Sequence, residues 1–145
     1  MIYGRNTISK VPEEFKCNRF EIYGNNTISK IPKDLKCKKI ILRGNNKISK
    51  IPEAFKCNYL EISGFNIIPK IPKCLKCNHL EIYGFNTISK IPKGFECDYI
   101  DIDGDNTISK IPEDLKCKYL KIKGFKIDLK KRYYMSNLEN IVELC

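Results

Sequence analysis

The chain has 145 residues, of which 42% are apolar, and a formal net charge of +10 from 27 basic and 17 acidic residues. This length is typical of one domain with room for a core. No run of residues reaches the roughly 18–20 apolar residues of a membrane-spanning helix, and no signal peptide opens the sequence. With cysteines expected to be reduced, these features predict a cytoplasmic protein.

A strict period of 20 residues organises the chain. Cys recurs once per period from Cys17 to Cys117, Gly from Gly4 to Gly124, and Pro from Pro12 to Pro112. A fixed period of this length is typical of a solenoid, in which each repeat packs only against its neighbours. We therefore expect about six repeats over residues 1–126, none of which would fold alone.

Each repeat begins with a predicted strand. In the repeat that starts at Cys77, Leu80 and Ile82 alternate with polar residues, which indicates a strand with one buried face. Because the register is the same in every repeat, the strands should form a parallel sheet, about 4.8 Å apart. Gly84 should end the strand with a positive φ, and Asn86 should bond to the adjacent coil as part of an asparagine ladder.

The return segment of each repeat is predicted to be extended or 3-10. Ile88 and Ile91 should turn inward, and Pro92 disfavours a regular helix because it lacks an N–H group and fixes φ. A last inward position alternates between a larger and a smaller side chain, which favours interdigitation along the stack. Its members are Phe15, Leu35, Phe55, Leu75, Phe95 and Leu115.

The pattern Cys-x-x-Leu-x-Ile-x-Gly-x-Asn-x-Ile-x-x-Ile-Pro-x-x-Phe resembles the leucine-rich repeat. The resemblance covers roughly residues 1–125, and the stretches 64–72 and 84–86 are similar to the FNIP-type repeat. It implies a curved solenoid with a parallel sheet on its concave face. It also implies a protein-binding role for that face, as in most members of the family.

The two ends depart from the repeat. Residues 127–145 are predicted to form a C-terminal cap, because the stretch 136–139 (Ser-Asn-Leu-Glu) reads as a capping box that opens a helix. A partner-binding helix is the alternative for this segment. At the N-terminus, Ile2, Ile8, Val11 and Phe15 would leave an apolar end exposed, so we expect either that another chain or copy covers it or that it belongs to a longer array.

Catalytic and metal chemistry have little support in the sequence. His79 is the only histidine, and no nucleophile–base pattern or phosphate-binding loop stands out, so we predict a non-enzymatic protein without a cofactor. The cysteine column lies at an inward apolar position and is interpreted as a buried cysteine ladder. The only Cys-x-x-Cys, from Cys74 to Cys77, has no second pair to complete a metal site.

Three columns of outward residues on the predicted sheet vary from repeat to repeat, unlike the core columns. Aromatic and acidic side chains gather in the middle and late repeats and predict a surface that binds a protein or peptide. The candidate binding residues are Tyr59, Glu61, His79, Glu81, Tyr83, Tyr99, Asp101, Asp103 and Tyr119. Exposed strands favour tyrosine and charged residues in any case, which is the alternative interpretation.

Two columns of lysine suggest a different partner. One includes Lys50, Lys70 and Lys90, and the other runs from Lys16 to Lys116 with Glu96 as an interruption. They favour binding to a polyanion or an acidic membrane surface, or they serve only solubility. Repeated Thr-x-Ser triplets could order water and bind ice, but Lys47 interrupts that array.

Overall fold

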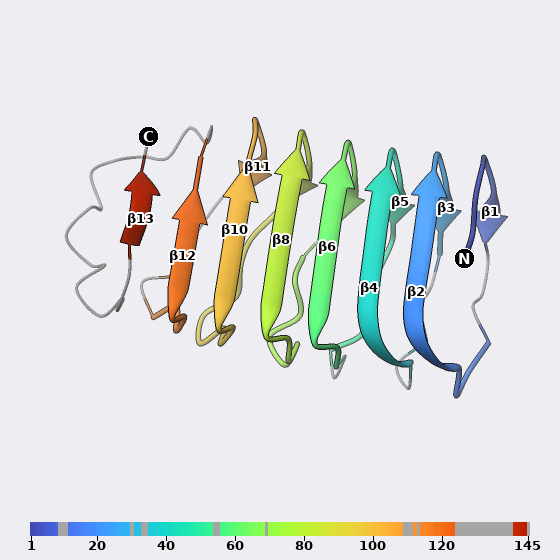
Figure 1. The fold of residues 1–145 in the computed structure, drawn as a ribbon. Helices are drawn as coiled ribbons and strands as arrows, with labels where there is room; N and C mark the ends of the chain where they lie inside the picture. The colour runs from blue at the N-terminus through green and yellow to red at the C-terminus, as the bar shows by residue number, and fades with distance from the viewer. Residues whose placement is uncertain are drawn as a thin grey trace.

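The structure, a computed structural model of residues 1–145, is a parallel β-solenoid (Figure 1). The described residues are 1–8, 12–29, 31–32, 35–53, 56–68, 70–108, 112, 114–123 and 141–144. Within them the strands form two sheets, one of seven strands and one of six. The predicted solenoid is therefore confirmed.

The larger sheet contains the strand predicted at the start of each repeat. In the described part of the chain, its strands in sequence order are β2 (Lys16–Gly24), β4 (Lys36–Gly44), β6 (Tyr59–Gly64), β8 (His79–Gly84), β10 (Tyr99–Asp103), β12 (Tyr119–Ile122) and β13 (Ile141–Leu144). All pairings are parallel, and from β2 to β12 each residue lies opposite the residue 20 positions later, as Leu60 opposite Leu80 illustrates. The predicted register is thus confirmed.

A second sheet of short strands follows the turn at the end of each long strand. In the same described residues its members are β1 (Thr7–Ile8), β3 (Thr27–Ile28), β5 (Lys47–Ile48), β7 (Ile67–Ile68), β9 (Thr87–Ile88) and β11 (Thr107–Ile108). The first residue of each faces solvent and the isoleucine of β3, β5, β7 and β9 is buried. The sequence did not predict this sheet, although extended structure was expected here.

The described residues contain no helix. These residues accordingly include no helix that is long and apolar enough to span a membrane. The return segments run through the short strands and then through turns near Pro72 and Pro92, as the missing N–H of proline favours. Extended return segments are confirmed, and 3-10 turns are not seen in this part of the chain.

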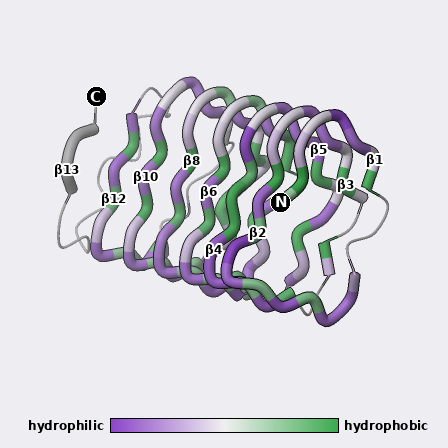
Figure 2. The backbone as a smooth tube through the Cα atoms, turned by 45° about the vertical axis from the view of Figure 1, so that its right-hand side comes forward, coloured by the Kyte–Doolittle hydropathy of each residue, from purple (hydrophilic) through white to green (hydrophobic). Residues whose placement is uncertain are grey.

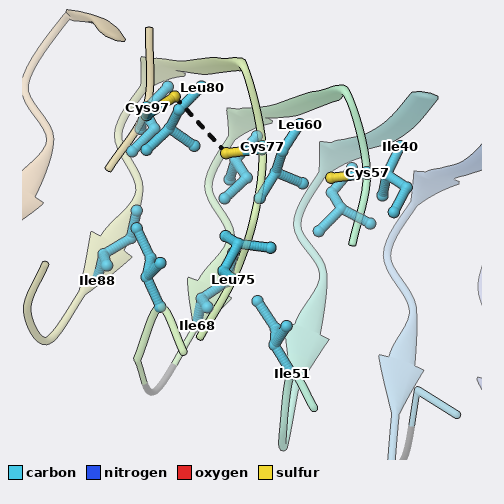
Figure 3. Packing of buried hydrophobic residues seen from close by; sticks show 14 of the residues in the cluster. Ile40, Ile51, Cys57, Leu60, Ile68, Leu75, Cys77, Leu80, Ile88 and Cys97 are labelled. Carbon is cyan, nitrogen blue, oxygen red and sulfur yellow. Dashed lines mark hydrogen bonds between the residues drawn. The ribbon is translucent and has the colours of Figure 1, made fainter. Parts of the chain in front are cut away.

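The core is a strip of apolar side chains between the two sheets. Leu60 and Leu80 from the larger sheet point toward Ile68 and Ile88 from the smaller one, and Figure 3 shows how these side chains repeat from coil to coil. Figure 2 shows the same repetition, with hydrophobic segments at corresponding places in successive coils. Each coil adds a similar set of contacts, so the core grows by stacking.

The alternating inward position is confirmed in the middle of the array. Leu35, Leu75 and Phe95 are at most 3% exposed. Leu115 is only partly buried, and Phe15 is 40% exposed, which confirms the exposed apolar side chain expected of Phe15 at the N-terminal end. Phe15 lies at the end of the stack, where it has coil neighbours on one side only. Phe55 lies outside the described residues.

The glycine that ends each long strand lets the coils approach closely. Gly64 has a φ of +102°, and a Cβ atom placed on it would lie 2.7 Å from the carbonyl oxygen of Gly44 in the preceding coil. A side chain there would carry both backbone strain and a steric clash. The predicted positive φ is therefore confirmed, and close stacking of the turns gives a second reason for glycine.

An asparagine ladder connects the turns. Asn66 is fully buried; its backbone N–H and its Nδ2 donate to Oδ1 of Asn86 at 3.0 and 2.8 Å, and its Nδ2 also donates to the Ser63 carbonyl at 2.7 Å. Its own Oδ1 accepts from the backbone N–H and Nδ2 of Asn46. The same pattern runs from Asn6 toward Asn106, which confirms the predicted ladder.

Residues near the C-terminus differ from the prediction. Residues 141–144 form β13, which pairs in parallel with β12, so the helix predicted to include Ile141 and Val142 is wrong there. β12 offers an edge of unpaired N–H and C=O groups, and a strand satisfies them where a helix would not. The start of the predicted helix, at 136–140, lies outside the described residues.

The ladder makes the central asparagines essential for stability. The substitution Asn66→Ala should lower the free energy of unfolding by about 2–4 kcal/mol, because it leaves several buried donors and acceptors without partners. Asn6→Ala at the exposed end of the ladder is the matched control and should cost about 1 kcal/mol or less. Urea unfolding followed by circular dichroism measures both, and equal losses would show that burial of the ladder contributes little.

Candidate recognition surface

The outward side of the larger sheet carries three parallel rows of side chains. The first row is Arg19, Lys39, Tyr59, His79, Tyr99 and Tyr119. The middle row is Glu21, Ile41, Glu61, Glu81, Asp101 and Lys121. The third row is Tyr23, Arg43, Ser63, Tyr83 and Asp103. Strand register therefore brings all nine predicted binding residues onto one face.

The middle row lies beneath the other two. Glu21, Glu61 and Asp101 are at most 5% exposed, whereas Glu81 is half-buried. These side chains point outward as predicted, but longer side chains of the first and third rows lean over them. Most of the acidic row is thus a buried polar network rather than an open acidic surface.

An arginine neutralises the carboxylate of Glu61. Nε and Nη2 of Arg43 donate to its two carboxylate oxygens at 2.6 and 3.1 Å, a bidentate pair from the neighbouring strand. Ser63 Oγ donates to the same carboxylate at 3.3 Å. Burial would raise the pKa of Glu61, but the hydrogen bond and charge of Arg43 outweigh it, and the pKa is lowered. Glu61 is therefore an anion at neutral pH.

Phenol groups hold the other carboxylates. Tyr59 donates to Glu81 at 2.5 Å, and Tyr83 and Tyr99 reach Asp101 Oδ2 at 3.4 and 3.5 Å. Burial and the charge of Asp101 raise the pKa of Tyr99 to about 12, and burial together with nearby carboxylates raises the pKa of Tyr59 and Tyr83 further. These phenols consequently remain protonated donors at neutral pH.

The first row is a continuous stack. The ring centroids of His79 and Tyr99 lie 5.1 Å apart, and those of Tyr99 and Tyr119 lie 4.4 Å apart with nearly parallel planes. Tyr59 lies 6.2 Å from His79, and the Lys39 ammonium sits 3.8 Å from the Tyr59 centroid. His79 is thus one member of a continuous stack of rings on the outer face of the sheet.

The sequence interpretation missed three contributors to this surface. Arg43 and Lys121 supply cations to Glu61 and Asp101, and Ser63 occupies the third row between two much longer side chains. Their columns were visible in the sequence. The contact between one repeat and the next was not, because it depends on how far each side chain reaches across the sheet.

The cysteine column faces the core. Cys37, Cys57, Cys77 and Cys97 are buried. In the described part of the chain, sulfur–sulfur contacts join only Cys17 to Cys37 at 3.1 Å and Cys77 to Cys97 at 3.6 Å, so a continuous cysteine ladder is not shown. No group of three or more His, Cys, Asp or Glu side chains converges on a common point within those residues.

The lysine columns and the Thr-x-Ser array lie on other surfaces. Lys36, Lys56 and Lys76 are exposed and stacked in register at the start of each coil, whereas Lys70 and Lys116 pair with Glu53 and Glu96. On the smaller sheet, the exposed side chains of Lys47 and Ile67 interrupt the threonines. Phe65 and Phe85 form an exposed stacked pair beside that sheet, with centroids 5.0 Å apart.

Comparison with protein-family models, with curated proteins and with solved structures finds no match to this chain. The leucine-rich-repeat and FNIP resemblances therefore stay predictions from the sequence pattern.

Thiol reactivity should distinguish the core cysteines from the surface one. Burial, with a further contribution from Cys37, raises the pKa of the Cys57 thiol to about 12, so at pH 8 only about one molecule in 10,000 carries the reactive thiolate. Cys74 is exposed and should react with iodoacetamide much faster. Mass spectrometry of alkylated peptides measures both rates. The difference should vanish in denaturant; equal rates in the native protein would contradict burial of Cys57.

Proposed function

We propose that the three-row face of the larger sheet is a non-enzymatic recognition surface for an extended segment of a protein or peptide. The observation that carries this proposal is the acidic middle row held between a stacked aromatic row and a third row of mixed chemistry. Aromatic rings supply rigid contact area, and the half-buried carboxylate of Glu81 supplies an acceptor for a partner's polar groups.

Preorganisation of the surface supports binding. Glu61, Glu81 and Asp101 are fixed by hydrogen bonds from neighbouring strands, and Tyr99 is fixed by stacking on both sides. Side chains that are already ordered lose little conformational entropy when a partner binds. The face also follows the solenoid axis, so an extended segment can contact several coils at once.

Substitution of two central tyrosines tests this function. Peptides selected from a displayed random library against the immobilised protein should bind the double variant Tyr83→Ala/Tyr99→Ala at least about tenfold more weakly, since interface tyrosines are common binding hot spots. Thermal unfolding, measured in parallel, should show that the variant remains folded.

The exposed pair Phe65 and Phe85 provides the matched control. The double variant Phe65→Ala/Phe85→Ala removes a stacked aromatic pair that lies off the three-row face, and it should bind the selected peptides as well as the unmodified protein does. Peptides that bind both double variants equally well, or a library that yields no binder, would rule out the proposed recognition surface.

A second candidate is binding of a polyanion or an acidic membrane surface by the stacked lysines. Lys16, Lys36, Lys56 and Lys76 are exposed and follow one another at the spacing of parallel strands. Four ammonium groups at about this 4.8 Å spacing repel one another, and a polyanion would relieve the repulsion as its counterions are released.

Heparin chromatography tests the second candidate. The double variant Lys36→Glu/Lys56→Glu should elute at lower salt than the unmodified protein. Lys70→Glu/Lys118→Glu changes the total charge equally, but at lysines that already pair with Glu53 and Asp98, and should elute later than the first variant. Identical elution of the two variants would mean that only net charge matters, and the absence of retention at low salt would exclude the candidate.

A further inference from the structure

Glu81 differs from the other carboxylates of the middle row. Arg19 pairs with Glu21, Arg43 with Glu61, and Lys121 with Asp101. Among the described residues no ammonium or guanidinium group forms an ion pair with Glu81, whose partners are the phenols of Tyr59, which donates a hydrogen bond, and Tyr83, which also interacts with it. Glu81 is also the one acidic member of the row in this part of the chain that solvent reaches, since the other three are buried.

The reason for this difference lies in the third row. Arg43 on β4 reaches the carboxylate of Glu61 on β6, and Tyr83 on β8 reaches that of Asp101 on β10. The residue in the corresponding position for Glu81 is Ser63 on β6. A serine side chain is too short to cross to the next strand, and the hydroxyl of Ser63 bonds to Glu61 on its own strand instead. Beside Glu81 the third row therefore has only the short side chain of Ser63, and this position, here called the notch, lacks the cross-strand donor present at Glu61 and Asp101.

The neighbouring carboxylate also has unused acceptor capacity. Asp101 lies opposite Glu81 in the strand register and is only 4% exposed. Its Oδ2 accepts hydrogen bonds from Tyr83, Tyr99 and Lys121. Its Oδ1 is buried without a hydrogen-bond partner among the described residues. A buried acceptor of this kind is normally satisfied, so its presence in the row is a second sign of a missing donor.

We infer that the notch formed by Ser63 and Glu81 is a subsite for one arginine side chain of the bound segment. The protein's own Arg43–Glu61 pair shows the geometry: a guanidinium that reaches across from the third row and meets a middle-row carboxylate of the next strand through two hydrogen bonds. The stacked rings of Tyr59 and His79 border the subsite on the first-row side. This inference rests on the proposed peptide-recognition function and specifies the chemistry of the segment.

A small probe tests the subsite directly. Amide signals of the isotopically labelled protein are followed by NMR during titration with N-acetyl-arginine amide. The neutral isostere N-acetyl-citrulline amide is titrated in parallel. The arginine derivative should produce saturable shifts centred on Ser63 and Glu81, and the citrulline derivative should not, because the carboxylate selects charge. Shifts that are spread over the surface without saturation would overturn the subsite.

Three variants sharpen the test. Glu81→Gln should weaken arginine binding about tenfold or more, because it removes the charge that the guanidinium pairs with. Ser63→Arg places a guanidinium beside Glu81 from within the chain and should abolish the saturable shifts while the thermal unfolding midpoint stays at least as high. Ser49→Arg adds the same side chain at an exposed position off this face and should leave arginine binding unchanged. Arginine binding that survives Ser63→Arg would disprove the subsite.

The subsite and the recognition function fail separately. Library peptides that bind through Tyr83 and Tyr99 but show no enrichment of arginine, and no weakening by Ser63→Arg, would remove the subsite and leave the function. Enrichment of lysine in place of arginine would also overturn the assignment to a guanidinium. Saturable binding of the arginine derivative together with a library that yields no binder would retain the subsite and remove the function.

Discussion

The stacking of identical positions at the spacing of one strand is the constraint on which the structure depends. It is enforced most strictly at the asparagine ladder, where each buried amide bonds both to the next asparagine and to a carbonyl in its own turn. One added residue between Asn66 and Asn86 would displace one from the other and leave buried polar groups unpaired. The constant period of 20 residues follows from this requirement.

The same constraint converts every position of the repeat into a row of like side chains. In the core this is favourable, because Leu60 next to Leu80 and Ile62 next to Ile82 simply extend an apolar strip. On the outer face it places carboxylates one strand apart, where like charges repel strongly under partial burial. Cations and phenols must therefore compensate the middle row, and variation in the outer rows is how the chain supplies them.

Much of the fold could be predicted because the same sequence pattern recurs in every repeat of the chain. The alternation around Leu80 and Ile82, the glycine turn and the asparagine ladder all follow from local chemistry. The second sheet was missed because strands such as β7 contain two residues, too few to show a periodicity. The four residues 141–144 are too few to distinguish the apolar period of a helix from that of a strand. In the structure they pair with the free edge of β12 and form a strand.

The candidate site was predictable as a set of residues and not as an arrangement. Alternation placed Glu61, His79 and Tyr99 on the outer face of the sheet. Whether a carboxylate there is open or covered depends on side chains from the adjacent strand, as Arg43 over Glu61 and Ser63 beside Glu81 demonstrate. Such contacts join residues about 20 apart in sequence, beyond the reach of a pattern within one repeat.

The net charge of the chain and the local chemistry of the three-row face favour different partners. The effect of the net charge on this face depends on how far the exposed lysines lie from it. The net charge of +10 favours an acidic partner, whereas the middle row is acidic. Lys56 is exposed and precedes β6, whereas Glu61 lies within that strand and is paired with Arg43. Exposed lysines at the start of each coil act on a ligand over Glu61 through solvent, where charges farther apart than a Debye length of ~8 Å are largely screened. Near contacts, not the total charge, thus determine the electrostatic environment of this face.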